Sequence, residues 1–375
     1  MINKDFPDLI WKEFYFDEIF DVKKGFYNKK PEFSNSERIP FLGATANNNG
    51  ITGFSSLEKI EKASKNGHGK NHSLKKKIFE GNCITVTNNG TSMGYAYYQK
   101  NEFTCSHDIN PLYLKDHKLN KHIALFLIVL IEKQKICFEY SRKWRPERMK
   151  KSKILIPVTD EGIPDWDFME SYMKEKEKLS LIKYKKYLKN RLNHLKKDIV
   201  SLEEDLISKN WKEFKINDVL SDIQRGRRLK REDHIKGATP YVSASATNNG
   251  IDDCVSNKEK VRIFSKCLTL ANSGTNAGAC FYQPFEFVAS DHVTKLANNN
   301  FNRHIYLFIG TVLSRLSEKY GFSREISDKR LKKEKIMLPI DDNDDPDWNF
   351  MESYMKKLEY DKISKYITYI ENQIK

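Results

Sequence analysis

The chain has 375 residues, and its 65 lysines and arginines outnumber 51 acidic residues, giving a formal net charge of +14 and a pI of about 9.2. No stretch approaches the roughly 18 apolar residues that a membrane-spanning helix needs, so we expect no transmembrane segment. A positive charge of this size favours a polyanionic partner, either nucleic acid or an anionic membrane surface. A genome whose proteins are all rich in lysine and asparagine would give the same balance, and composition leaves that alternative open.

The most informative feature is a long internal repeat. The segment PDWDFMESYMK at 164–174 returns as PDWNFMESYMK at 346–356, with one substitution in eleven residues. The motif WKEF begins at Trp11 and returns at Trp211. This period is far longer than the roughly 20–50 residues of solenoid repeats, so it indicates a duplicated domain. Two similar sites on one chain predict a bipartite partner.

The spacing between the copies shortens along the chain. It is 200 residues from Trp11 to Trp211 but 184 from Cys83 to Cys267. The first copy therefore has 16 extra residues (200 minus 184), which we place in the segment 56–77. Because this segment is rich in lysine, serine, asparagine and glycine, we expect an exposed loop, where insertions cost little stability.

Each copy is expected to be a mixed α and β globule with short strands. In the first copy we expect strands at 83–86, 95–98 and 153–157, and a helix at 121–135. The second copy repeats this order, with strands at 265–270, 279–282 and 335–339, and a helix at 303–319. The six cysteines have no CxxC spacing and are interpreted as reduced core residues; they stand at 83, 105, 137, 254, 267 and 280.

A long helix is expected after each globule. The segment 166–207 has no proline or glycine, and its leucines and isoleucines recur at spacings of four and three up to Leu206, which is a heptad seam. This helix would have roughly 42 residues and a length of about 63 Å. A narrow apolar stripe needs a partner helix. We predict an antiparallel pair with the C-terminal helix, packed through Leu188, Leu192, Leu195, Ile199, Leu202, Ile363, Ile367 and Ile370.

The predicted fold class is α+β, with two duplicated mixed α/β globules separated by two long helices in an antiparallel coiled coil and related by a pseudo-two-fold axis. The expected boundaries are 1–163 for the first globule, 164–208 for the central helix, 209–345 for the second globule and 346–375 for the distal helix.

This order of features, found twice, resembles the specificity (S) subunits of type I restriction-modification systems and the similar S subunits of BcgI-like type IIB systems. The resemblance covers nearly the whole chain. It is carried by the WKEF motif, the glycine turns at Gly25 and Gly226, the Asn-Asn-Gly loops, and the Lys-Ile-x-x-Pro strand that leads into Pro-Asp-Trp. It implies two target-recognition domains, each reading one half of a bipartite DNA sequence, with helices that space them and dock methyltransferase subunits.

The resemblance also implies a cytoplasmic, non-catalytic chain. Its partners would be double-stranded DNA and methyltransferase subunits, two of them, with restriction subunits as a further candidate and no membrane. The chain itself would need no cofactor, and S-adenosylmethionine is expected on the partner methyltransferase subunit. The sequence leaves open whether the system is type I or type IIB. It also leaves two other classes of function, a DNA-binding enzyme (a restriction or nicking endonuclease) and a protein-binding scaffold.

Sequence motifs for catalysis or metal binding are weak. The chain has neither a methyltransferase motif of the Asn-Pro-Pro-Tyr kind nor a GxxxxGK[ST] phosphate loop. His68 and His72 have a spacing that can bind metal on a helix, but they lie in the inserted segment and the second copy has no counterpart. The cluster CSHD at 105–108 becomes ASDH at 289–292, so we expect a hydrogen-bonded turn there rather than a metal site.

Polar loops and basic clusters are the candidate DNA contacts. Asparagine can pair with adenine, and serine or threonine with phosphate, whereas arginine and lysine suit phosphate and guanine. The alternatives are turn chemistry for the asparagines and a solvated face for the basic residues. In the first copy the candidates are Lys24, Asn47, Asn48, Asn49, Asn88, Asn89, Thr91, Ser92, Arg142, Lys143 and Arg145. In the second copy they are Arg225, Arg227, Arg228, Asn248, Asn249, Asn272, Ser273, Thr275, Asn276 and Arg324.

Overall fold

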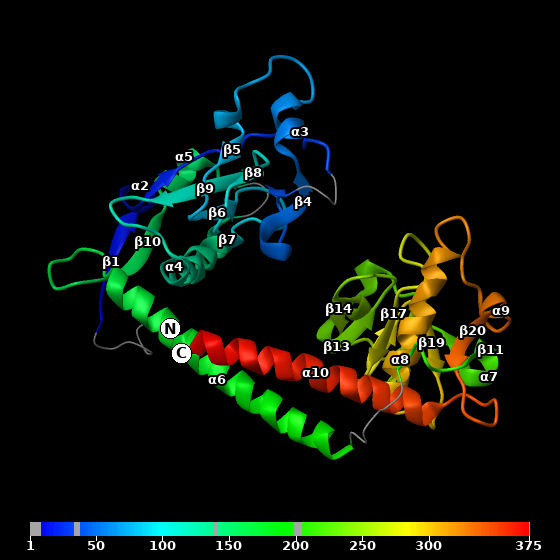
Figure 1. Ribbon diagram of the computed structural model, residues 1–375. Helices are drawn as coiled ribbons and strands as arrows, with labels where there is room; N and C mark the ends of the chain where they lie inside the picture. The colour runs from blue at the N-terminus through cyan, green and yellow to red at the C-terminus, as the bar shows by residue number, and fades with distance from the viewer. Residues whose placement is uncertain (1–8, 34–37, 139–141, 199–204, 375) are drawn as a thin grey trace. The chain divides into compact units, whose positions relative to one another are not determined.

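The computed structural model describes residues 9–33, 38–138, 142–198 and 205–374 (Figure 1). The chain divides into two compact units, Met1–Leu181 and Ile182–Lys375, and the boundary falls inside the long helix α6 (Trp166–Asp198). Each unit contains one copy of the repeated globule. None of the described helices is both long and apolar enough to cross a membrane.

In the residues described, the first globule has two four-stranded sheets and a two-stranded ribbon. One sheet has the order β2-β9-β6-β7 and is antiparallel, whereas in the sheet β4-β3-β8-β5 the central strands β3 and β8 run parallel. The ribbon pairs β1 with β10 and places Trp11 opposite Pro157. The strands are β1 (Ile10–Tyr15), β2 (Phe20–Val22), β3 (Ile39–Leu42), β4 (Ile51–Ser55), β5 (Ile78–Phe79), β6 (Cys83–Thr87), β7 (Ala96–Gln99), β8 (Phe103–Cys105), β9 (Ile109–Leu114) and β10 (Lys153–Val158).

The second globule repeats this topology strand for strand. Its sheets have the orders β12-β19-β16-β17 and β14-β13-β18-β15, again with a parallel central pair, and its ribbon pairs β11 with β20. The strands are β11 (Trp211–Lys215), β12 (Asp222–Arg225), β13 (Lys236–Val242), β14 (Ile251–Val255), β15 (Ile263–Phe264), β16 (Cys267–Ala271), β17 (Cys280–Gln283), β18 (Phe287–Ala289), β19 (Val293–Ala297) and β20 (Lys335–Pro339). The predicted mixed α and β globules and their duplication are confirmed.

One amphipathic helix packs on the antiparallel sheet of each globule. In the first, α4 (Lys121–Lys133) buries Ile123 and Leu127 against Ile84 of β6. In the second, α8 (Arg303–Ser314) plays the same part. An asparagine caps each helix, because Asn120 and Asn302 accept hydrogen bonds from the first free backbone amides. The shorter helices are α2 (Phe16–Ile19), α3 (Leu57–Lys62), α5 (Pro146–Lys150), α7 (Ile216–Val219) and α9 (Asp328–Leu331), and the 3₁₀ turns are η1 (Asn48–Gly50), η2 (Leu74–Lys76), η3 (Gln134–Cys137), η4 (Arg231–Asp233), η5 (Asn248–Gly250) and η6 (Arg315–Glu318).

Two expectations for the globules are corrected. The segment 56–77 is not simply an exposed loop, because it forms α3 and η2 and buries Lys77 completely. The cysteines are free thiols, but only some belong to the core: Cys83, Cys105 and Cys267 are buried, whereas Cys137 and Cys254 are exposed.

The central helix is shorter than predicted. Helix α6 is described from Trp166 to Asp198 rather than to 207, and residues 205–208 form a turn. Leu206, predicted to continue the seam, lies in that turn and packs against the core of the second globule. Ile199 and Leu202 lie outside the described residues. The distal helix α10 spans Trp348–Ile374 as expected.

The part of α6 in the second unit packs antiparallel to α10. Lys185 of α6 pairs with Glu371 of α10. Arg191, which lies later in α6 than Lys185, pairs with Glu359, which lies earlier in α10 than Glu371. On this seam Leu188, Leu195 and Ile370 are buried, and Leu192, Ile363 and Ile367 are partly buried.

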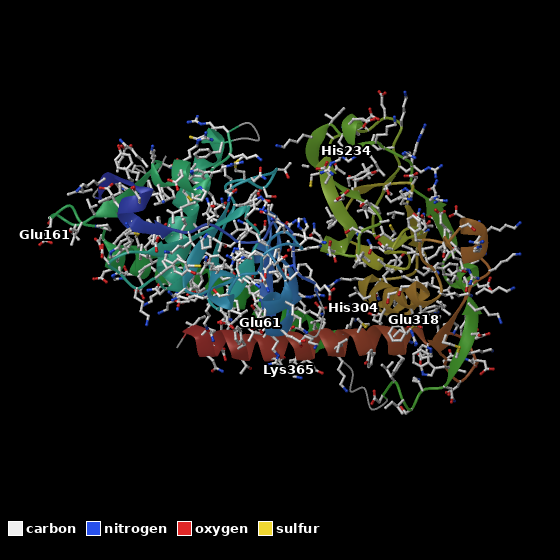
Figure 2. The ribbon with its side chains drawn as sticks, turned by 90° about the horizontal axis from the view of Figure 1, so that it is seen from above. Glu61, Glu161, His234, His304, Glu318 and Lys365 are labelled. Carbon is white, nitrogen blue, oxygen red and sulfur yellow. The ribbon has the colours of Figure 1, made fainter. Side chains whose placement is uncertain are left out.

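Each globule is joined to its long helix by an equivalent histidine–glutamate contact. His122 Nε2 lies 2.8 Å from Glu177 in the first unit. His304 Nε2 lies 3.0 Å from Glu359 in the second, where Figure 2 labels it beside α10. Glu359 also accepts bonds from Arg191 and Arg303. Burial alone would raise the pKa of Glu359, but these three donors outweigh it and lower the pKa to about 2.

Candidate nucleic-acid interface

In the first globule, three segments far apart in the sequence meet at Asn88, just after β6. Asn88 is buried, and its Nδ2 donates to the carbonyl of His107 and to Asn110 Oδ1, at 3.2 and 2.7 Å. The backbone amide of Trp144 donates to the carbonyl of Asn88. Trp144 itself is fully buried. This framework fixes where the neighbouring basic residues stand.

The surface above this framework is a small basic pocket of about 120 Å³. Its lining includes the cations Lys24, Lys143 and Arg145, which come from two separate parts of the chain, together with Asn89. The Nδ2 of Asn89 donates to Asp108 Oδ1 at 2.9 Å. The structure therefore brings together five of the candidate residues that the sequence identified: Lys24, Asn88, Asn89, Lys143 and Arg145. Three cations converging on one concave surface suit phosphate or a guanine edge.

A glycine before each turn allows the basic residue next to it to lie this close. A Cβ on Gly25 would come within 2.0 Å of the Ser106 carbonyl oxygen, and a Cβ on Gly226 within 2.1 Å of the Ser290 carbonyl oxygen. Real Cβ atoms do not approach backbone so closely. Only glycine therefore lets the chain pass between the loops at these two positions.

The second globule builds the same framework with different chemistry. Asn272 is fully buried, and the backbone amide of Ile326 donates to its carbonyl, as Trp144 does in the first copy. Arg225 donates from Nε to the Asp291 carbonyl and from Nη2 to Asn272 Oδ1. The guanidinium of Arg225 is thus held by the protein, whereas no carboxylate among the residues described pairs with Lys24.

At the rim the two copies exchange donor and acceptor groups. Where the first copy has Asn89 bonded to Asp108, the second has the Ser273 hydroxyl bonded to His292 Nδ1. The positions that match Lys143 and Arg145 are Glu325 and Ser327. A shared scaffold with different polar groups at the same place is what two readers of different DNA sequences require.

A model of the family described as Type I restriction modification DNA specificity domain matches residues 10–184 and 208–369, which cover both globules. The chain belongs to this family. It is a DNA specificity subunit of a restriction-modification system with two target-recognition domains, and such subunits are not catalytic.

Similar proteins carry related descriptions. The chain is 29% identical over 287 residues to the type II restriction enzyme specificity subunit S.BcgI of Heyndrickxia coagulans, covering 76% of this chain and 80% of that one. It is 23% identical over 279 residues to a protein of Mycoplasma pneumoniae described as a type I specificity subunit, covering 72% of this chain and 69% of the other. Among solved structures, the type I S subunit from M. genitalium aligns with a TM-score of 0.42 at 16% identity, covering 98% of this chain and 94% of that one.

The Asn-Asn-Gly loops of both target-recognition domains adopt the turn chemistry that the sequence left as an alternative. Asn48, Asn49 and Gly50 all have positive φ, at 50°, 52° and 79°. Asn48 Nδ2 donates to the Ile51 carbonyl, and Asn248 makes the same bond to Ile251. These asparagines have a structural reason to be present, although Asn47–Asn49 and Asn248–Asn249 remain exposed at the surface.

The remaining candidates are distributed around these frameworks. Arg142 and Arg324 stack on equivalent aromatic rings, with the guanidinium carbon 5.7 Å from the Phe138 centroid and 5.0 Å from the Tyr320 centroid. The residues that remain exposed or partly exposed are Arg227, Arg228, Thr91, Ser92, Thr275 and Asn276, and Asn276 also donates to the Ala244 carbonyl.

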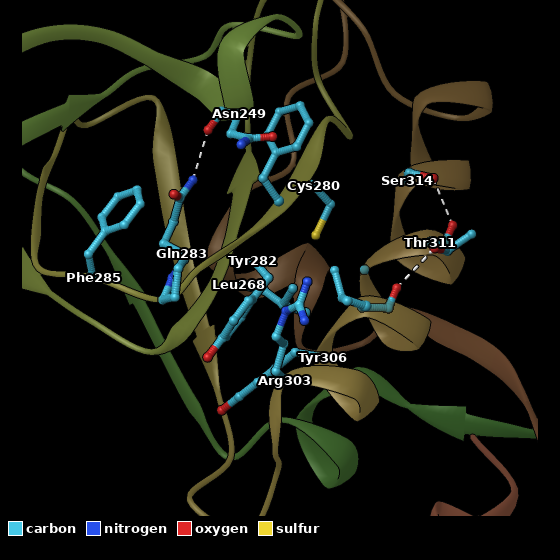
Figure 3. A pocket seen from close by; sticks show the side chains of 14 residues that line it. Asn249, Leu268, Cys280, Tyr282, Gln283, Phe285, Arg303, Tyr306, Thr311 and Ser314 are labelled. Atoms are coloured by element: carbon cyan, nitrogen blue, oxygen red, sulfur yellow. Dashed lines mark hydrogen bonds between the residues drawn. The ribbon is translucent and has the colours of Figure 1, made fainter. Parts of the chain in front are cut away.

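A larger pocket of about 440 Å³ in the second domain, between β17 and α8, is a different kind of site (Figure 3). It is opened by Gly310, which stands where the first copy has Ile128. Several of its polar groups are already satisfied: Thr311 and Ser314 donate within their own helix, and Gln283 donates to the Asn249 carbonyl. Burial also raises the pKa of the Cys280 thiol to about 12, so it stays protonated.

The histidines whose spacing could suit a metal lie in the ordered insertion, and His72 is held by packing. The His72 ring packs edge-on against Phe26, with centroids 5.3 Å apart. In the part of the chain that the structure describes, no three His, Cys, Asp or Glu side chains lie close enough to hold a metal ion.

Sequence reasoning missed two exposed aromatic features. Phe322 is 84% exposed in the tight turn closed by Gly321 and Arg324. On the long helices, Tyr184, Tyr187, Tyr366 and Tyr369 are all exposed and contact one another in a row. The PDW motif recurs after 182 residues (346 minus 164), and this spacing could have revealed the row, since it relates Tyr184 to Tyr366 and Tyr187 to Tyr369.

Proposed function

We propose that the domains at 1–163 and 209–345 each read one half of a bipartite DNA sequence, and that the helical segments 164–208 and 346–375 separate them. The observation that carries the proposal is the shared framework around Asn88 and Asn272 with a different polar rim in each copy. The same backbone can thereby present different hydrogen-bond donors and acceptors to two different sequences.

We infer the roles of individual residues from their burial. Asn88 and Asn272 have little or no exposed surface, and their amide groups bond internally, so they position the reading loops. Lys24, Lys143 and Arg145 contact phosphate or base edges in the first half-site, with Asn89 among them. In the second half-site the contacts come from the exposed Arg227, Arg228 and Arg324, with Thr275 and Asn276 beside them. The Ser273 hydroxyl is buried and holds the exposed His292 at the rim. The exposed asparagines at 47–49 and 248–249 contact the DNA backbone that flanks each half-site.

The partners of the helices are methyltransferase subunits, and the tyrosine row of Tyr184, Tyr187, Tyr366 and Tyr369 is their docking face. Tyrosines are enriched in protein interfaces because one ring supplies both apolar area and a hydroxyl. The row pairs equivalent positions of the two repeats, which suits two copies of the same subunit. S-adenosylmethionine binds on those subunits, where methyl transfer takes place.

The test is reconstitution with the methyltransferase subunits and mapping of methylation on a DNA library randomised in both half-sites. Lys143→Ala with Arg145→Ala should relax or weaken recognition of one half-site only, and Arg227→Ala with Arg228→Ala should affect only the other. Loss of a bidentate base contact should cost about 1–3 kcal/mol. If either pair altered both half-sites, or neither pair altered any, the assignment of one half-site per domain would be wrong. The co-purified partner also identifies the system, because a fused nuclease–methyltransferase indicates type IIB and a separate motor nuclease indicates type I.

A further inference from the structure

The insertion found only in the first target-recognition domain folds into an ordered module. Lys77 is fully buried, and its Nζ donates to the carbonyls of Ile60 and Glu61 and to Asn71 Oδ1, at 3.0, 2.8 and 2.6 Å. Tyr27 Oη donates to the same Ile60 carbonyl. Glu61, labelled in Figure 2, lies in α3. These bonds hold the inserted residues in one position against the domain.

The module forms one wall of a groove of about 900 Å³, and lysines dominate its charge. Residues 65, 75 and 76 come from the insertion, and residues 23 and 24 come from the turn before Gly25. Two carboxylates line the groove, Asp21 and Glu80. Five lysines line it as well: Lys23, Lys24, Lys65, Lys75 and Lys76.

Most of this positive charge is not neutralised by the protein. Lys23 pairs with Asp21. In the described part of the chain, no carboxylate lies within ion-pair distance of Lys65, Lys75 or Lys76. Lysines kept together without acidic partners repel one another, and that arrangement is relieved by an anion.

The groove adjoins the pocket that is proposed to read DNA. Lys24 lines both of them, beside Lys143 and Arg145 on one side and beside Lys75 and Lys76 on the other. The second domain has only the short segment 256–262 in place of the insertion, so it has no equivalent wall.

We propose that this groove binds the phosphodiester backbone of the DNA next to the first half-site, so that the first domain contacts more phosphates than the second. The proposal rests on the proposed reading function, because it extends the same DNA from Lys24 into the groove. Lysine ammonium groups suit phosphate as point charges, and such contacts add affinity without sequence information.

The test compares two triple variants of the complex reconstituted with its methyltransferase subunits. The groove variant carries Lys65→Gln, Lys75→Gln and Lys76→Gln. The control variant removes the same charge from lysines of the insertion that do not line the groove, Lys59→Gln, Lys62→Gln and Lys70→Gln. Affinity for the target sequence that methylation mapping identifies is measured over a series of salt concentrations. Phosphate-ethylation interference then locates the phosphates that the protein contacts.

The groove variant should flatten the plot of log affinity against log salt by about 1 to 3, since each phosphate contact contributes roughly 0.9 to the slope. Interference should disappear at phosphates beside the first half-site only, and both half-site sequences should be retained. The control variant should keep the slope of the unmodified complex.

An unchanged slope in the groove variant would overturn the proposal. Equal flattening in both triple variants would also overturn it, because the salt dependence would then come from the total charge of the insertion and not from the groove. The Lys143→Ala/Arg145→Ala variant, measured alongside, separates the two claims. If it changes the first half-site while the groove variant changes nothing, the reading function stands and the groove proposal alone fails. If it changes neither half-site, the reading site itself is wrong.

Discussion

Tyr184 and Tyr366 occupy the same position of the two repeats, and their rings meet edge to face with centroids 5.9 Å apart. In an antiparallel helix pair such as this one, two equivalent residues contact each other near a local two-fold axis between their helices. Leu188 and Ile370, which are also equivalent, are both buried beside this point. The duplication therefore shapes the helix pair as well as the globules.

The outer tyrosines of this row should be needed for docking rather than folding. Tyr187 and Tyr369 are 62% and 53% exposed, so Tyr187→Ser with Tyr369→Ser should change the free energy of unfolding by no more than about 0.5 kcal/mol per site. Co-elution with the methyltransferase subunits should be lost. Lys183→Ser with Lys365→Ser, an exposed and equivalent pair on the same helices, is the matched control and should still bind. Binding by the tyrosine variant would refute the docking face.

The Glu359 contact should make the second unit sensitive to acid. The pKa of Glu359 is lowered to about 2 in the folded protein, against an unfolded value near 4.3. Its contribution to stability is therefore complete above about pH 4.3 and is lost as the pH falls towards 2. Glu359→Gln should reduce stability at neutral pH by up to about 3 kcal/mol and flatten the pH dependence in that window.

Glu177→Gln is the internal comparison for this measurement. Lys121 and His122 donate to Glu177 and lower its pKa, but within the described first unit no arginine pairs with Glu177 as Arg191 pairs with Glu359. Unfolding followed by tyrosine and tryptophan fluorescence between pH 2 and 7 should show a smaller loss for Glu177→Gln. Equal losses would mean that the arginine adds nothing.

The glycine turns give a test of each reading domain by itself. In Gly25→Ala the new Cβ would lie 2.0 Å from the Ser106 carbonyl oxygen, so the Ser106 loop should move and recognition of the first half-site should weaken. In Gly226→Ala the new Cβ would lie 2.1 Å from the Ser290 carbonyl oxygen, so recognition of the second half-site should weaken. Gly321→Ala, where a Cβ would meet nothing within 4 Å, is the control. Methylation mapping should then show one half-site lost in each variant and neither lost in the control.

The repeated globules could be predicted from the sequence because the repeat supplies its own comparison. Core strands such as Cys83–Thr87 and Cys267–Ala271 recur with the same apolar pattern, and the structure places both in the centre of a sheet. The end of the first long helix could not be predicted. Leu206 keeps the heptad spacing although it packs on a globule, and spacing alone does not say which surface covers an apolar residue.

The candidate site was predictable in its residue types but not in their roles. Asn88 and Asn89 are neighbours of the same type, yet Asn88 is buried and Asn89 lines the surface pocket. The fold of the insertion was missed for a related reason. The buried ammonium of Lys77 bonds mainly to the backbone carbonyls of Ile60 and Glu61. Because every residue has a backbone carbonyl, the sequence does not identify these partners.

The exchanged polar pairs at the rim should determine which bases are read. Asn89 with Asp108 presents a carboxylate acceptor, whereas the buried Ser273 holds His292 so that an imidazole is presented. A carboxylate can accept from the amino group of cytosine, and an imidazole can donate to a purine acceptor. The double change Asn89→Ser and Asp108→His should therefore alter base preference in the first half-site by about 1–3 kcal/mol at one position. The second half-site should be unchanged, and the reciprocal change Ser273→Asn with His292→Asp should do the opposite. Methylation mapping on the randomised library measures both. If the two variants keep the original preferences at full affinity, these pairs only hold the loops together, and base reading must come from the neighbouring cations.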